Sequence, residues 1–261
     1  MVFVDQLKRS LELPSLPKRI VSLVPSQTEL LVDLSLESSI VGITKFCVHP
    51  HYIRKQKNIV GGTKQVNFSK IKALRPDIIL CNKEENTKSV VSELEKFTPV
   101  HISDISTIQQ CFELINMYGE LFNVEAQAQQ LIARIHKKRD DFRQRFAEPR
   151  LKVAYFIWNN PHMVAGSDTF INEMLLEAGF INVFQDDSRY PEIELNHPKL
   201  IEVDAIFLSS EPFPFKEKHV MDLKKQFPKK HILIVDGELF SWYGSRLLKS
   251  YSYFSQLHDE N

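Results

Sequence analysis

The chain has 261 residues, of which 43% are hydrophobic and 25% charged, as in an ordinary globular protein. Its 33 basic and 33 acidic side chains give a formal net charge of zero. That balance argues against a general binder of nucleic acid or of anionic membranes, because both need a basic excess or patch. The three cysteines share no metal-ligand spacing, so neither a disulfide framework nor a zinc site is expected.

The amino-terminal stretch MVFVDQLKRS has only four apolar residues before Asp5. A secretory signal needs about 7–15 apolar residues after a basic start, and a membrane span needs about 18. The sequence as it stands therefore predicts a cytoplasmic chain that is not embedded in a membrane. A periplasmic or surface-anchored location is expected instead if an export signal was removed.

Short apolar runs alternate with helical patterns in the first part of the chain. Ser26 or Thr28 is expected to cap the first of these helices. Strands are expected at 20–24, 41–43, 78–80 and 100–102, and helices at 28–36, 68–74 and 85–97. This alternation is typical of a mainly parallel sheet covered by helices.

The pattern is purely helical from Ile108 to Phe146, with Asn123 as the expected break. The second helix, at 124–146, would be about 35 Å long. Alternation then resumes, with strands expected at 152–158, 205–208 and 231–235 and helices at 169–178, 220–226 and 245–257.

The expected fold class is therefore α/β: two Rossmann-like three-layer lobes with mainly parallel sheets, joined by one long backbone helix. The domains expected are an N-terminal α/β lobe at 1–107, a helical region with the linking helix at 108–147, and a C-terminal α/β lobe at 148–261.

Five features in this order resemble the helical-backbone (class III) substrate-binding proteins of ABC importers. They are RIVSLVPSQTELL followed by VGIT, then VGGTKQVNFSKIKALRPDIIL, the long helix, MVAGSDTFINEMLLEAGFINVF, and DGELFSWYGSR. Each alone occurs in other α/β proteins, whereas all five in order cover about residues 18–257. The family serves importers of vitamin B12, haem, siderophores and some bare metals, and the sequence is most similar to the cobalamin-binding branch. The resemblance implies that a metal chelate, first of all a corrinoid such as cobalamin or cobinamide, is bound between the lobes for transport or salvage.

The resemblance places the ligand against loops at the carboxyl ends of the strands, where sheet topology also favours a site. Aromatic faces suit a flat macrocycle, amides and hydroxyls suit its polar rim, and cations suit a phosphate or propionate. The expected ligand-binding residues are Gln27, His49, Thr63, Lys64, Trp158, Asn159, Arg189, Phe213, Trp242, Tyr243 and Arg246. Each also has an ordinary alternative, such as core packing for Trp158 or a helix cap for Arg246.

His49, in CVHPHY, is the most ambiguous of these residues. It lies in the loop where cobalamin binders of this family place an aromatic contact, and its imidazole could instead ligate the metal of a bound chelate axially. The alternative is a loop histidine bonded to the backbone. No catalytic residue and no required cofactor are expected, since the corrinoid or other metal chelate is the ligand.

Exported family members dock on an ABC permease through one acidic residue on each lobe. Here Ser69 and the segment 195–198 stand where the acids are expected, with Glu194 and Glu202 close by, so docking is expected to be weak. The motifs GxSxG, GxGxxG and HExxH and the P-loop are missing from the sequence, and no enzyme is expected. The open alternatives are a haem or ferric-siderophore binding protein, and an intracellular tetrapyrrole-processing enzyme such as a metal chelatase using His49 and Glu238.

Overall fold

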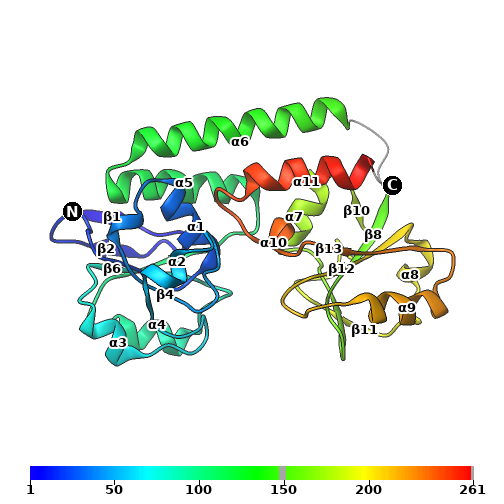
Figure 1. Ribbon diagram of the computed structural model, residues 1–261, viewed down its shortest axis with the longest axis horizontal. Coiled ribbons are helices and arrows are strands. Elements are labelled where there is room, and N and C mark those ends of the chain that lie inside the picture. Colours follow the sequence, from blue (N-terminus) through cyan, green and yellow to red (C-terminus); the bar gives the residue numbers. More distant parts are fainter. Residues whose placement is uncertain (147–150, 260–261) are drawn as a thin grey trace. The chain divides into compact units, whose positions relative to one another are not determined.

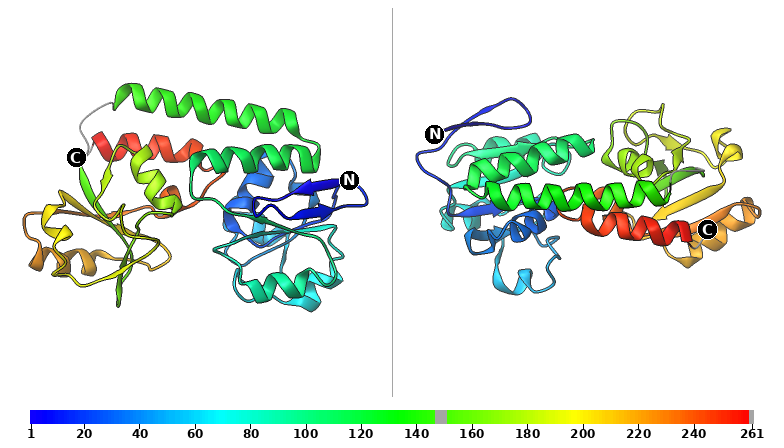
Figure 2. Two further views of the ribbon diagram at one scale, coloured as in Figure 1. Left: turned by 180° about the vertical axis from the view of Figure 1, so that it is seen from behind. Right: turned by 90° about the horizontal axis from the view of Figure 1, so that it is seen from above.

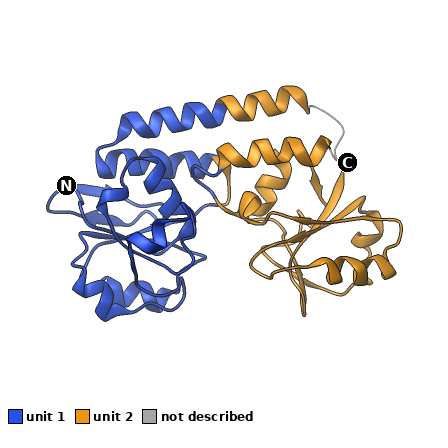
Figure 3. Ribbon diagram, in the orientation of Figure 1, with its two compact units in different colours: residues 1–105, 109–136, 243–246 blue, residues 106–108, 137–242, 247–261 orange. Residues whose placement is uncertain are grey.

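The structure is a computed structural model that describes residues 1–146 and 151–259. The chain divides into two compact units (Figure 3). Unit 1 comprises residues 1–105, 109–136 and 243–246, and unit 2 comprises residues 106–108, 137–242 and 247–261. The helical region expected at 108–147 is thus shared between the units, and its expected boundary at 147/148 lies outside the described residues.

Unit 1 contains a five-stranded sheet in the order β5-β4-β3-β6-β7, of which β4 and β6 are labelled in Figure 1. Its strands are β3 (Ile20–Ser22), β4 (Ile40–Ile43), β5 (Asn58–Ile59), β6 (Ile78–Asn82) and β7 (Val100–Ser103). Every neighbouring pair is parallel, as the apolar runs predict. All five carboxyl ends therefore lie at one edge of the sheet.

Helices cover both faces of this sheet. The helices α3 (Phe68–Ala73) and α4 (Lys88–Leu94) pack on one face, where Ile71 and Leu94 join a core with Ile79 and Cys81. On the other face lie α1 (Pro25–Asp33) and α5 (Ile108–Phe122), and the ring of Tyr118 from α5 contacts His101 of β7 at 5.4 Å. The short elements η1 (Glu37–Ser39) and α2 (Ile53–Gln56) lie in the connections beside β4. Unit 1 is the expected three-layer lobe.

Helix α1 begins earlier than the sequence predicts. Pro25 takes its first position, where a fixed φ suits a helix start, and Val24 precedes it without a side-chain cap. The cap expected from Ser26 or Thr28 is therefore wrong. The Thr28 hydroxyl lies inside the helix and donates to the Val24 carbonyl at 3.1 Å, in contact with Ser22 Oγ at 2.8 Å.

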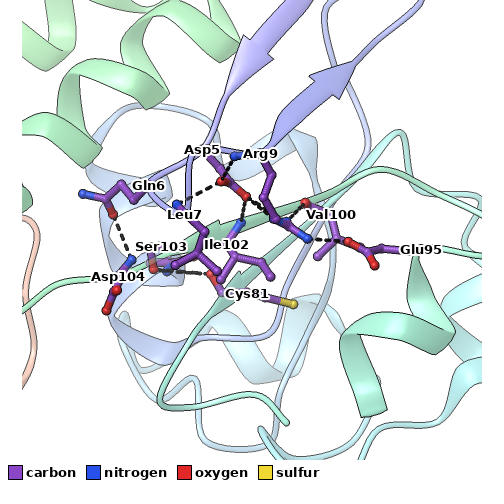
Figure 4. Close-up of polar contacts among 11 residues, drawn as sticks. Asp5, Gln6, Leu7, Arg9, Cys81, Glu95, Val100, Ile102, Ser103 and Asp104 are labelled. Carbon is purple, nitrogen blue, oxygen red and sulfur yellow. Dashed lines mark hydrogen bonds and ion pairs between the residues drawn. The ribbon is translucent and has the colours of Figure 1, made fainter. Parts of the chain in front are cut away.

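A hairpin of β1 (Val2–Val4) and β2 (Ser10–Glu12), which sequence patterning did not predict, docks on unit 1 through the buried Asp5. The Asp5 carboxylate accepts hydrogen bonds from the backbone N–H groups of Leu7, Arg9 and Ile102, at 2.9, 3.0 and 3.2 Å (Figure 4). Because Ile102 belongs to β7, one carboxylate both shapes the turn and ties it to the sheet.

The long helix α6 (Glu125–Arg145) follows α5 after Asn123, whose left-handed φ of 56° confirms the expected break. Its 21 residues make it about 30 Å long. In unit 1 its first half runs beside α5 (Figure 2), where Ala128 meets Gly119 and the tilted rings of His136 and Phe112 lie 4.5 Å apart. From Lys137 onward the helix belongs to unit 2.

Unit 2 contains a sheet in the order β11-β9-β8-β12-β13, with β10 also paired to β8. Its strands are β8 (Lys152–Trp158), β9 (His162–Val164), β10 (Ile181–Asn182), β11 (Glu192–Ile193), β12 (Ala205–Ser209) and β13 (His231–Val235). The pairs of β8, β12 and β13 are parallel, whereas β9 is antiparallel to both of its neighbours. The sheet is thus mainly parallel in its centre, and β8, β12 and β13 end at one edge.

Two groups of helices cover the sheet of unit 2. On one face α8 (Lys199–Glu202) and α9 (Glu217–Gln226) cover Ile206 and Leu208. On the other face Phe207 contacts Phe180 at 5.1 Å and Phe240 at 6.3 Å, under α7 (Phe170–Glu177), α10 (Glu238–Ser241) and α11 (Leu247–Asp259). The expected α/β fold class, with two mainly parallel lobes and a long helix shared by both, is confirmed.

Candidate functional site

The centre of the unit 1 sheet is a topological switch point, because β3 has β4 on one side and β6 on the other. In open α/β sheets a crevice for ligands lies outside the carboxyl ends of such strands. Gln27, in the first turn of α1, lies at this point and is fully buried. The residues around Gln27 therefore decide what this crevice can hold.

A segment from far along the chain, residues 243–246, occupies the crevice of unit 1. The Gln27 amide nitrogen donates to the Tyr243 hydroxyl at 2.9 Å and to Ser103 Oγ at 2.6 Å, and the Tyr118 hydroxyl donates to the Gln27 amide oxygen at 2.8 Å. Burial raises the pKa of Tyr243, which keeps its phenol neutral. Gln27 and Tyr243, both expected to bind ligand, are thus bonded to protein groups inside unit 1.

Two further contacts anchor this segment. The Gly244 N–H donates to Cys111 Sγ at 3.1 Å. The Arg246 guanidinium makes a bidentate, buried ion pair with Glu29, with contacts of 2.7 and 3.1 Å. Arg246, which was expected to bind a ligand anion, thus has its guanidinium bonded to a carboxylate of α1 inside unit 1.

The loops after β4 and β5 present more accessible groups. Phe46, which the sequence analysis did not select, is 49% exposed, and the Lys45 ammonium lies 5.0 Å from the centre of its ring. Gly62 lies against the same ring. Thr63 is half-buried, its carbonyl accepts from Asn86 Nδ2 at 2.7 Å, and Lys64 is exposed. An aromatic residue three positions after the end of an apolar strand was the feature in the sequence that could have identified Phe46.

His49 lies in the same β4 loop and is half-buried, with its ring centre 5.4 Å from that of His51. Within the described part of the chain, no group of three or more His, Cys, Asp and Glu side chains is arranged to hold a metal ion. Axial ligation of a bound chelate by His49 needs only one ligand from the protein, and it stays a prediction.

Unit 2 places an aromatic cluster at the carboxyl ends of β8 and β12, formed by Trp158, Phe213, Phe215 and His219. Trp158 is 39% exposed, and its ring meets that of Phe213 edge to face at 5.6 Å. Phe213 in turn contacts Phe215 at 4.8 Å and His219 at 5.3 Å. Asn159 follows Trp158 and is half-buried. An exposed indole supported by further rings is the type of surface on which planar ligands stack.

Glu211 lies beside this cluster, two residues beyond the end of β12. Its Oε1 accepts from Ser241 Oγ at 2.8 Å and from the Trp242 indole N–H at 2.9 Å. Burial raises the pKa of Glu211; the charges of Glu238 and Asp236 add to this, and the two hydrogen bonds oppose it. Trp242 is only 9% exposed, so its indole holds Glu211 and has little surface free for stacking.

Arg189, another expected ligand-binding residue, is exposed in unit 2. One of its guanidinium nitrogens donates to the Asp168 carbonyl at 2.6 Å, and the guanidinium carbon lies 5.4 Å from the Tyr190 ring centre. Its backbone has a left-handed φ of 62°, and its N–H donates to the Ser167 carbonyl at 2.8 Å. These contacts show a role in shaping the loop between β10 and β11.

A shallow hollow of about 640 Å³ in unit 1 lies away from these loops. It is lined by residues 9–12 and 95–100, at the end of the sheet where β7 begins. Arg9 in this lining donates to Asp5, to Glu95 and to the Val100 carbonyl (Figure 4). The main polar groups of the hollow are thus hydrogen-bonded to one another, and these bonds join the hairpin to the sheet. The hollow is therefore distinct from the site that the topology predicts at the carboxyl ends of the strands.

Among the curated relatives, an uncharacterised ABC transporter substrate-binding lipoprotein of Bacillus subtilis, YvrC, is 26% identical over 73% of this chain and 65% of its own length. A vitamin B12-binding protein of Yersinia pseudotuberculosis is 25% identical over 70% of this chain and 66% of its own length. The chain thus spans slightly less than two thirds of each of these relatives.

The fold is similar to that of a periplasmic haem-binding protein from Pseudomonas aeruginosa, with a TM-score of 0.78 and 23% identity over 93% of this chain and 92% of that one. None of the described helices has the length and apolar character needed to cross a membrane. The family model described as "Periplasmic binding protein" matches residues 20–232. This chain therefore belongs to the periplasmic binding protein family.

Proposed function

We propose that this chain binds a metal chelate, with a corrinoid such as cobalamin or cobinamide as the preferred ligand, and that it returns the ligand unchanged. The observation that supports this most strongly is the aromatic cluster of Trp158, Phe213, Phe215 and His219 at the strand-end edge of unit 2, in a chain of this family. A planar macrocycle can stack on the exposed indole of Trp158 and bury its apolar face there.

Residues from unit 1 complete the proposal. Phe46 is exposed at the equivalent edge, and Thr63, Lys64 and His49 lie in neighbouring loops. Hydroxyl and ammonium groups suit the amide, phosphate or carboxylate groups at the rim of such ligands. We therefore propose Phe46 as a ligand contact in addition to the residues expected from the sequence, with Gln27, Tyr243 and Arg246 acting mainly by shaping unit 1.

A spectral titration tests this function. Cyanocobalamin, dicyanocobinamide, hemin and a ferric hydroxamate siderophore are each titrated into the protein, and both the absorption of the chelate and the tryptophan fluorescence are followed. Saturable binding of a corrinoid in preference to the others is expected. Preference for hemin or the siderophore would instead select one of the alternatives named above. Conversion of a metal-free porphyrin into a metallated product would show a chelatase.

The partner proposed is the permease of an ABC importer, because relatives include a substrate-binding lipoprotein of such a transporter. Ser69 is exposed in the first turn of α3, where the resemblance leads us to expect an acid, while Glu194 is exposed next to segment 195–198 of unit 2. A docking surface built on acid-to-arginine pairs would thus rely on one unit, and we propose that association is weak.

A further inference from the structure

We propose that Glu211 determines the specificity of the chelate site, by accepting hydrogen bonds from a ligand rim that carries amide N–H groups and by disfavouring a rim that carries carboxylates. This inference rests on the proposed function, since it names the class of chelate that the same site takes.

The position of Glu211 puts its side chain next to the proposed stacking surface. β12 ends at Ser209, and Glu211 precedes Pro212 and Phe213, whose ring contacts Trp158. A macrocycle stacked on Trp158 would present its rim to whatever polar groups lie beside the cluster. Glu211 is such a group, at the same carboxyl edge as the end of β13.

The orientation of Glu211 is fixed by two donors that share one oxygen. Ser241 Oγ and Trp242 Nε1 both bond to Oε1, at 2.8 and 2.9 Å. Both donors stabilise the ionised carboxylate and thereby oppose the effect of burial on the pKa of Glu211. For Oε2, no hydrogen bond or ion pair to any described residue is found. The second oxygen is therefore the one left to accept from a ligand.

Gly237 makes room for this arrangement. Its φ of −63° is open to any residue, so backbone conformation does not require glycine there. A Cβ at position 237, however, would lie 2.4 Å from Ser209 Oγ and 2.7 Å from Glu211 Cγ. Glycine is thus needed because Ser209 and Glu211 come close to the backbone at position 237. The lack of a side chain there leaves room for Glu211 beside the end of β13.

The fixed carboxylate of Glu211 distinguishes ligands by the groups at the edge of the macrocycle. It accepts hydrogen bonds and donates none, so primary amides of a corrinoid rim are good partners. Carboxylates, such as the propionates of haem, are repelled by Glu211 and by the nearby Asp236 and Glu238. The geometry therefore favours neutral, amide-bearing chelates at this part of the site.

Two ligands that differ only at the rim give the sharpest test. Dicyanocobinamide carries primary amides on the corrin, whereas dicyanocobyrinic acid carries carboxylates on the same corrin. The ratio of their affinities is measured for the wild type and for Glu211→Gln, which keeps an oxygen for Ser241 and Trp242 and turns an amide N–H₂ toward the ligand. The wild type should prefer the amide form, and the ratio should fall by roughly tenfold or more in the variant.

The matched control is Glu202→Gln. Glu202 ends α8 just before the amino end of β12, is exposed, and is 3.6 Å from Lys152. This change therefore removes the same charge at the end of β12 opposite to Glu211. The affinity ratio should stay at its wild-type value in the control. An equal fall in the control would overturn the inference, because the effect would then be one of net charge.

Other outcomes also decide the matter. If Glu211→Gln weakens both ligands equally, Glu211 only supports the fold and the inference is wrong. If Glu211→Gln is too unstable to measure, Ser241→Ala replaces it, because this change removes one of the donors that fix Oε1. The affinity ratio should then fall by a smaller factor, and an unchanged ratio in Ser241→Ala overturns the inference. A wild type that binds neither corrinoid refutes the proposed function as well, whereas binding with an unchanged ratio refutes only the role of Glu211.

Discussion

His101 makes unit 1 sensitive to acid in a way that can be measured. Its side chain is buried between β7 and α5, and neither ring nitrogen has a hydrogen-bond partner among the described residues. Burial lowers its pKa from 6.5 to about 4; the charge of Asp5 opposes this, and that of Arg9 adds to it. The folded chain therefore holds His101 neutral over a range of pH in which the unfolded chain takes up a proton.

The sign and size of the effect follow from linkage between protonation and folding. Above pH 6.5 His101 is neutral in both states and has no effect on the pH dependence of stability. As the pH falls from 6.5 to about 4, only the unfolded state binds the proton, so the free energy of unfolding decreases. At about 1.4 kcal/mol for each pH unit, the loss over this window is about 3 kcal/mol.

The substitution His101→Leu tests this value. Leucine has a similar volume, suits the buried position and cannot be protonated, so the variant should lack this part of the acid sensitivity. Urea unfolding is followed by far-UV circular dichroism at several pH values, because both tryptophans belong to unit 2 and their fluorescence reports on that unit. The difference in unfolding free energy between variant and wild type should grow by about 3 kcal/mol between pH 6.5 and 4. A constant difference would refute the reasoning.

Three further predictions concern the ligand site, unit 2 and the cell. Trp158→Ala should weaken corrinoid binding by about 1–3 kcal/mol, measured by titration of chelate absorption, whereas unchanged affinity would contradict the proposed stacking surface. Burial raises the pKa of Glu177, but the charges of Arg139 and Arg143 lower it by more, so the pKa in the folded chain lies below 4.5. The ion pairs of Glu177 therefore stabilise unit 2 above pH 4.5, and this stabilisation is lost as the pH falls through the lowered pKa. Glu177→Gln should therefore cost roughly 3 kcal/mol at neutral pH, read from tryptophan fluorescence during unfolding, and less in acid; an equal cost at both would be evidence against the ion pairs. Finally, fractionation of cells with mass analysis of the native amino terminus will distinguish the cytoplasmic chain from an exported one, and recovery outside the cytoplasmic membrane would refute the cytoplasmic prediction.

The main strands and long helices could be predicted because burial imposes a pattern on them. The run 78–82 is apolar over most of its length, since both faces of β6 are covered, and the break at Asn123 was visible from the residue type. The elements that were missed are short, such as β10 and β11 with two residues each, and so few residues show no periodicity. The hairpin at the amino terminus depends on one carboxylate, Asp5, bonding to backbone groups, which no apolar pattern reveals.

The candidate site was harder to predict than the fold. Gln27, Tyr243 and Arg246 are polar residues in loops or at helix ends, and their types alone do not distinguish a ligand contact from a buried protein contact. The structure gives each of them a protein partner more than 75 positions away along the chain, among them Ser103 for Gln27 and Glu29 for Arg246. Such partners depend on tertiary packing, which composition and spacing do not encode locally.

The assignment of residues 243–246 to unit 1 has a consequence for how the protein can be made. During synthesis the ribosome releases the sheet of unit 1 long before Tyr243 is made, so Gln27 and Ser103 lack this partner until residues 243–246 have emerged. Both flanks of this segment belong to unit 2, so no single cut in the gene separates the two units. A fragment that ends before residue 243 should therefore leave Glu29 without the Arg246 guanidinium that pairs with it. Addition of a peptide that contains residues 243–246 should restore this ion pair.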